Sequence, residues 1–177
     1  MLDTLITSKT RIKLLVKFFL NPKSSAYLRS LESEFGESTN SIRLELNKFE
    51  KADLLNSTMN GNRKMFKANE RHPLFSNING LVRKHLGIDA LVEHVVKRLG
   101  GLKFVYLTGD LAKGIDTNII DLILVGDDIN RVYLTELVEK AEKLIDRKIR
   151  FAIYSIEEHE SAQMEIEKEG GLLVFNG

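Results

Sequence analysis

The start of the chain has hydrophobic residues at helical spacing. Between residues 12 and 19, apolar side chains recur at i, i+3, i+4 and i+7. This pattern predicts an amphipathic helix that Ser8 caps and Asn21-Pro22 ends. A second, shorter helix is expected from about Ser25 to Phe35, with Gly36 as its stop signal. The chain therefore opens with two helices and a tight connection to the next element.

A third helix and a β-hairpin follow. The helix is predicted from Ser38-Thr39 to about residue 52, with one apolar stripe that comprises Ile42, Leu46 and Phe49. Asn60-Gly61 is a strong hairpin signal and lies between strand-like runs at residues 54–59 and 64–68. Three helices with a trailing hairpin predict a winged helix-turn-helix.

The second half alternates between strand and helix patterns. Strand-like runs cover residues 103–108, 119–125 and 148–154. Before them, two helical stretches separated near Gly87 form a connector. The helix between the second and third runs has an expected inward face of Leu134, Leu137, Val138, Ala141 and Leu144. A last, acidic helix begins at Ser155, where Glu158 completes a capping box. This alternation predicts a small α/β sheet covered by helices.

Composition and charge divide the chain in two. The 177 residues are 43% hydrophobic and 29% charged and contain no cysteine, which is typical of a globular protein and favours a cytoplasmic location. No run is apolar enough for a membrane span or a signal peptide. Residues 1–86 carry 15 basic against 8 acidic side chains, a net +7, and residues 87–177 carry 11 against 17, a net −6. A basic half of this kind fits nucleic acid.

The third helix and the hairpin tip carry the candidate DNA contacts. In a winged helix-turn-helix the third helix enters the major groove, and a basic hairpin tip reaches the backbone or the minor groove. Side chains that can read base edges are Asn40, Arg43 and Asn47, and expected phosphate contacts are Ser38, Thr39, Lys48, Arg63 and Lys64. Two alternatives stay open: a solvated polar face, or a module that docks protein. Glu45 and Glu50 share the helix and would repel phosphate if the helix were rolled slightly.

The stretch "YLTGDLAKGIDTNIIDLILVG" resembles the core motif of nucleotidyltransferases of the DNA polymerase β superfamily. In that family a strand ends in Gly-Ser, a short helix follows, and two carboxylates on the next strand clamp two magnesium ions. This chain has Asp110 at the Ser position and Asp121 as the acid on its strand, with Ile119 or Ile123 in place of the partner. The third strand offers Arg150 and Ala152 where a third carboxylate is usual. We therefore expect no catalytic residues, no metal site and no cofactor.

Ligand binding without turnover is a separate hypothesis for this loop. The residues that could hold a nucleotide, another anion or magnesium are Gly109, Asp110, Lys113, Gly114 and Asp121. The alternative is a loop that is retained only for packing. The four histidines, His72, His85, His94 and His159, lack metal-ligand spacing and are interpreted as surface or packing residues.

Nearly the whole chain resembles prokaryotic proteins that fuse an ArsR-type winged helix-turn-helix to a degenerate minimal nucleotidyltransferase-like domain. The resemblance implies an α+β, two-domain fold, with DNA binding in residues 1–75, a helical connector at 76–100 and the nucleotidyltransferase-like α/β domain at 101–177. It implies a transcriptional regulator of double-stranded DNA that uses the second domain for sensing, dimerisation or partner binding. A homodimer is expected because a single winged helix reads too few base pairs for genomic specificity. Alternatives are an active nucleotidyltransferase that modifies a protein, RNA or small molecule, and an antitoxin-like partner protein.

Overall fold

The computed structural model describes residues 2–177 and has an α+β fold divided into two compact units. One unit contains the residues up to His85 together with Gly114–Asp116, and the other contains Leu86–Lys113 and Thr117–Gly177. Within residues 2–177, no helix has the length and apolar character that crossing a membrane requires.

The first unit is built on helices, and three of its helix ends lie where the sequence signals predict them. Its helices are α1 (Leu2–Leu5), α2 (Lys9–Leu15), the π-helical turn η1 (Val16–Leu20), α3 (Leu28–Phe35), α4 (Thr39–Lys51) and α5 (Phe75–Leu86). Ser8 caps α2 and Ser38 caps α4, each accepting a hydrogen bond from the backbone N–H three residues on. Gly36 ends α3 at φ 63°, a left-handed conformation that favours glycine. The predicted stripe of Ile42, Leu46 and Phe49 is buried.

The sheet of the first unit contains a strand that sequence analysis took for helix. Its strands are β1 (Ser25–Tyr27), β2 (Leu55–Asn60) and β3 (Arg63–Ala68), in the antiparallel order β1-β3-β2. The second helix therefore begins at Leu28, and the prediction of a start near Ser25 was wrong. Ala26 lies opposite Phe66 of β3, and both are buried. This long-range pairing overrides the local helical pattern.

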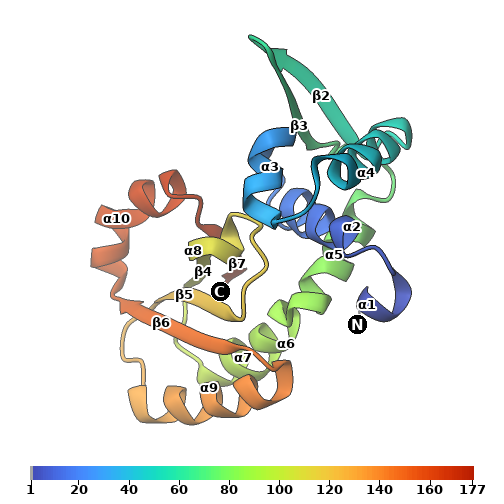
Figure 1. Cartoon of the computed structure of the whole chain (residues 1–177). Helices are drawn as coiled ribbons and strands as arrows, with labels where there is room; N and C mark the ends of the chain where they lie inside the picture. The colour runs from blue at the N-terminus through green and yellow to red at the C-terminus, as the bar shows by residue number, and fades with distance from the viewer. Residues whose placement is uncertain (1) are drawn as a thin grey trace. The chain divides into compact units, whose positions relative to one another are not determined.

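The hairpin β2–β3 closes through a two-residue loop. Asn60 pairs with Arg63, so the central residues of the turn are Gly61 and Asn62. Gly61 has φ 56°, the positive value that a type II′ turn requires at its first central position. In Figure 1 the hairpin projects away from the helices of the first unit.

The second unit is a mixed sheet with helices on both faces. Its strands β4 (Phe104–Thr108), β5 (Ile119–Val125), β6 (Lys148–Tyr154) and β7 (Leu172–Asn176) have the order β6-β5-β4-β7. β4 is antiparallel to both β5 and β7, while β5 and β6 are parallel and are connected by α9 (Arg131–Ile145). The remaining helical elements are α6 (Ile88–Leu91), η2 (Val92–Val96), α7 (Lys97–Leu99), α8 (Gly109–Ala112) and α10 (Ile156–Lys168). Figure 1 shows α9 and α10 on different sides of β6.

Two details of the second unit differ from the sequence analysis. Leu144 is 59% exposed, so its predicted inward orientation was wrong. The inward stripe instead continues from the buried Ala141 to the half-buried Ile145, one helical turn later, because side chains at i and i+4 share a face. β7 was not predicted, and its short apolar run becomes a strand by pairing with the edge of β4.

Candidate nucleic-acid interface

Helix α4 separates its polar and apolar residues onto opposite faces. Asn40, Arg43 and Asn47 are exposed, and Ile42, Leu46 and Phe49 are buried. At the start of the helix, the Ser38 hydroxyl accepts from the Ser41 N–H at 3.2 Å. The three predicted base-reading side chains therefore share one exposed face, and Ser38 acts as the cap of that helix.

A groove of about 670 Å³ lies between α4, the start of α3 and the hairpin. It is lined by Tyr27, Leu28, Arg29, Arg43, Leu46, Asn47, Asn62, Arg63, Lys64 and Phe66. Four of these lining residues are basic and none is acidic. A concave surface of one charge sign concentrates the opposite charge, so this groove attracts a polyanion.

Aromatic rings support the basic side chains of the groove. The Arg63 guanidinium lies 4.7 Å from the ring centroid of Tyr27, and Lys64 Nζ lies 5.2 Å from that of Phe66. Cations at these distances are attracted by the faces of aromatic rings. Strand β1, which sequence analysis missed, thus supplies the ring on which Arg63 rests.

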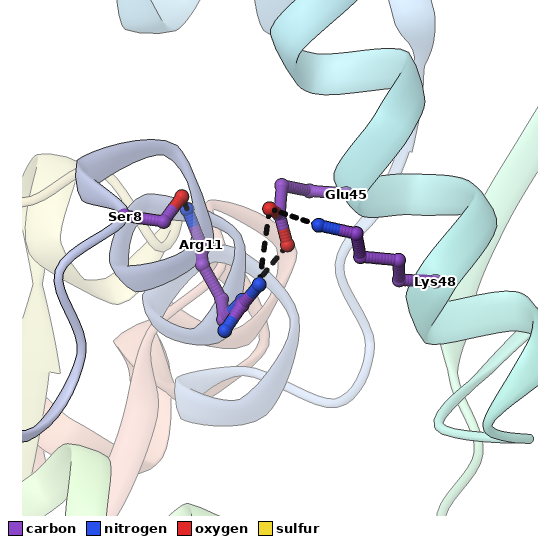
Figure 2. A network of polar contacts seen from close by, with 4 residues as sticks. All are labelled: Ser8, Arg11, Glu45 and Lys48. Carbon is purple, nitrogen blue, oxygen red and sulfur yellow. Dashed lines mark hydrogen bonds and ion pairs between the residues drawn. The ribbon is translucent and has the colours of Figure 1, made fainter.

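Glu45 is held on the inner side of α4 by two cations. Its side chain is 9% exposed, and Arg11 of α2 donates to it from Nε at 2.8 Å and from a terminal nitrogen at 3.1 Å. Lys48 donates to the same carboxylate at 3.0 Å, one turn further along α4 (Figure 2). The hydrogen bonds from Arg11 lower the pKa of Glu45, with Lys48 adding to the effect and burial opposing it. This carboxylate is neutralised inside the unit and does not join the exposed polar face.

Glu50 also has its charge compensated. Lys64 of β3 donates to it at 2.7 Å, and the Ser57 hydroxyl donates to its other oxygen. These bonds, the one from Lys64 first, lower the pKa of Glu50. Lys64 is therefore shared between this carboxylate and any phosphate that enters the groove.

The predicted DNA-contact residues fall into distinct places. The groove brings together Arg43, Asn47, Arg63 and Lys64. Ser38, Thr39 and Asn40 lie at the start of α4, outside the groove lining, and Lys48 is turned toward Glu45. Sequence analysis missed Tyr27, Arg29 and Asn62, since a position next to a groove leaves no periodic signal in the chain. Asn62 alone had a local marker, because it directly follows Gly61 in the turn.

In the second unit, an arginine forms an ion pair with Asp121, the lone carboxylate of β5. Arg150 lies opposite Asp121 in the parallel register and donates to both of its oxygens, at 2.6 and 2.9 Å. These bonds raise the pKa of Arg150. The flanking positions Ile119 and Ile123 pair with Lys148 and Ala152. The strand face that sequence analysis examined for metal ligands thus presents one acid bound to a guanidinium.

The glycine loop is shaped around the same aspartate. Gly109 has φ 68°, and a Cβ atom there would lie 2.5 Å from Asp121 Oδ2. Gly109 and Lys113 line a pocket of about 390 Å³ with Thr108, Ile123, Ile166, Glu169 and Gly171. Asp110 is exposed and its negative charge acts on Arg150, the partner of Asp121. Gly114 groups with the first unit.

The donor set does not fit a pair of magnesium ions. Magnesium needs oxygen ligands in octahedral geometry, and Asp121 already binds Arg150 through both carboxylate oxygens. Among residues 2–177, no group of three or more His, Asp or Glu side chains is placed to hold a metal ion. His159 is buried and hydrogen-bonded to the Tyr106 hydroxyl at 2.9 Å, which makes it a packing residue.

Comparison with known proteins finds similarity over about half the chain. No protein-family model and no curated protein matches it. Solved structures similar to the chain include AF1382 from Archaeoglobus fulgidus, with 14% identity and a TM-score of 0.39 over 48% of this chain and 96% of that one. A structure of a mutant form of the toxin–antitoxin pair MntA–HpeT matches with 16% identity and a TM-score of 0.39, over 51% of this chain and 72% of that one. Sso10a-2, a DNA-binding protein from Sulfolobus solfataricus, matches with 16% identity and a TM-score of 0.35, over 52% of this chain and 96% of that one. These scores carry no conclusion about function.

Proposed function

We propose that the protein is a sequence-specific, DNA-binding transcriptional regulator. Its first unit would be a winged helix-turn-helix, with α4 in the major groove and the β2–β3 hairpin as the wing. Its second unit would be a catalytically inactive nucleotidyltransferase-like domain that serves sensing, dimerisation or partner binding. A homodimer on a two-fold operator would give the genomic specificity that one short recognition helix lacks.

The observation that carries this proposal is the basic groove beside the exposed face of α4. Arg29, Arg43, Arg63 and Lys64 converge on it, and the acids of α4 that could oppose DNA are neutralised by Arg11, Lys48 and Lys64. Phosphates dominate the affinity of DNA-binding proteins, while side chains in the groove supply specificity. Both kinds of contact can be made by one continuous surface of the first unit.

The test separates base reading from phosphate binding. Sequences bound by the full chain are first selected from a random duplex pool, and the affinities of the selected and random duplexes are then measured against salt. We expect Arg43→Ala to lose preference for the selected sequence by about 1–3 kcal/mol. Arg63→Ala should weaken both duplexes about equally and reduce the salt slope by roughly one.

A matched variant controls for the loss of charge. Lys140→Ala removes one exposed cation from α9 of the second unit and should bind DNA like the parent. The proposal fails if the parent does not distinguish selected from random duplexes, or if Arg43→Ala and Arg63→Ala behave like Lys140→Ala.

The proposed inactivity of the second unit has its own test. Because Arg150 binds Asp121 and the neighbouring strand positions are isoleucine, we expect no transfer of label from nucleoside triphosphates with magnesium or manganese to proteins or RNA of a cell extract. Label transfer by the parent that Asp121→Asn abolishes would instead establish a nucleotidyltransferase.

A further inference from the structure

A leucine lies on the exposed face of α4, next to two of the predicted base-reading residues. Leu44 is 53% exposed. With about 100° between successive residues of an α-helix, it shares its face with Asn40 and Asn47 and points away from Ile42 and Phe49. A large apolar side chain is therefore presented beside the two predicted base-reading asparagines, on the side away from Arg43.

Exposure alone does not assign a role to Leu44, since single exposed leucines are common. Its neighbours do. Asparagine can form two hydrogen bonds with adenine in the major groove, and the base paired with adenine is thymine. The C5-methyl group of thymine is the apolar group that the major groove presents, and apolar side chains recognise it by contact. A leucine between two asparagines thus matches the chemistry of A·T pairs.

The spacing along α4 supports the same partner. At about 1.5 Å of rise per residue, Leu44 lies roughly 6 Å from Asn40 and 4.5 Å from Asn47 along the helix axis. Successive base pairs are about 3.4 Å apart. Leu44 is therefore one to two base-pair steps from each asparagine, close enough for the three side chains to contact neighbouring pairs.

We propose that Leu44 is a specificity-determining residue that contacts the 5-methyl group of a thymine in the major groove. This inference rests on the proposed DNA-binding function and specifies the base that is recognised, thymine, and the group that is contacted, its 5-methyl group. When α4 enters the groove, the leucine side chain and the methyl group leave water together, which stabilises the complex on thymine-containing sites.

Replacing thymine by uracil tests this contact, because the two bases differ only in the 5-methyl group. Duplexes selected by the full chain are resynthesised with deoxyuridine at one thymidine position at a time, and their dissociation constants are measured. The parent should bind about fourfold more weakly when the contacted thymidine is replaced, the value expected for one buried methyl group. Leu44→Ala should bind the two duplexes equally.

Leu74→Ala is the matched control. Leu74 is 54% exposed in the same unit and lies in the turn before α5, outside the exposed face of α4. This variant loses the same side-chain atoms and should keep the fourfold preference for thymine. Circular dichroism melting curves of both variants should overlay that of the parent, because both side chains are exposed.

Distinct results overturn the inference and the function on which it rests. If the parent binds selected duplexes without any thymine preference, the role of Leu44 is wrong and DNA binding stands. The same holds if Leu44→Ala retains the preference. If Leu44→Ala instead lowers the molar mass in sedimentation while the preference persists, the leucine packs against a second copy and the inference is wrong. A parent that binds no duplex overturns both proposals.

Discussion

At the scale of single residues, charge pairs decide which side chains of α4 are available for binding. Glu45 and Glu50 belong to the helix that should enter DNA, yet both carboxylates are held by cations. A carboxylate that is paired in the folded state does not add free negative charge to the surface. The sequence shows the acids and the bases but not which of them meet.

Glu45→Gln should destabilise the first unit. Breaking a fully buried ion pair costs about 3–5 kcal/mol, and because Arg11 is 37% exposed we expect roughly 1–3 kcal/mol here. Urea unfolding of the full chain measures the change. Glu50→Gln is the control, and its more exposed pair with Lys64 should contribute less than about 1 kcal/mol. Equal losses for the two variants would contradict the buried role of Glu45.

Both glutamates also predict a dependence of stability on pH. Their pKa values are lowered from the ordinary value of 4.5 when the chain folds, so the unfolded chain takes up protons first as the pH falls. The stability that they contribute is complete above pH 4.5 and is lost as the pH drops through the lowered pKa values. Unfolding free energies measured below this pH should fall less steeply in Glu45→Gln than in the parent. An unchanged slope would show that Arg11 does not hold Glu45 in solution.

At the scale of elements, the hairpin depends on one glycine and on a partner strand. Gly61 adopts φ 56°, and β3 is flanked by β1 and β2, so the turn and both strands act together. The ring of Tyr27 lies beside Arg63 only when β1 pairs with β3, whereas Phe66 and Lys64 share strand β3. The shape of the hairpin should therefore control the phosphate contacts.

Gly61→Ala should strain the hairpin without a steric clash. No atom lies within 4 Å of the added Cβ, so the cost is the left-handed backbone, about 1–2 kcal/mol. Thermal unfolding should register this loss, together with weaker binding to all duplexes. Gly80→Ala, in the interior of α5 and equally free of contacts, should instead stabilise the protein by roughly 0.5–1 kcal/mol. A neutral Gly61→Ala would mean that the turn relaxes to another conformation.

At the scale of the whole molecule, the two units differ in charge and in chemistry. The net charge of +7 over residues 1–86 is concentrated in part on the groove, and residues 87–177, with a net −6, include the lone strand carboxylate that Arg150 binds. This division favours nucleic acid as a ligand of the first unit, while in the second unit the carboxylate of β5 is already bound by Arg150.

The affinity for DNA should depend steeply on salt. Arg29, Arg63 and Lys64 are the basic groove residues left for phosphate when Arg43 reads bases, and one phosphate neutralised by each gives a slope of log K against log salt of about −2 to −3 per protomer. Fluorescence anisotropy of a labelled duplex between about 50 and 200 mM salt measures it. A slope near zero would show that the groove does not hold the phosphate backbone.

The sequence by itself determined most of the helices and strands, and it placed a single acid on strand β5. Helix α4, its cap Ser38 and its buried stripe follow from a period of 3.6 residues, and strands β4, β5 and β6 follow from runs of apolar residues between turn signals. These are local patterns, in which neighbours along the chain carry the information. Only the tertiary structure decided that residues 25–27 form a strand, that β7 joins the sheet, that Arg11 holds Glu45, and that Arg150 binds Asp121. Each of these features joins segments distant in sequence, and such contacts depend on packing that no local pattern records.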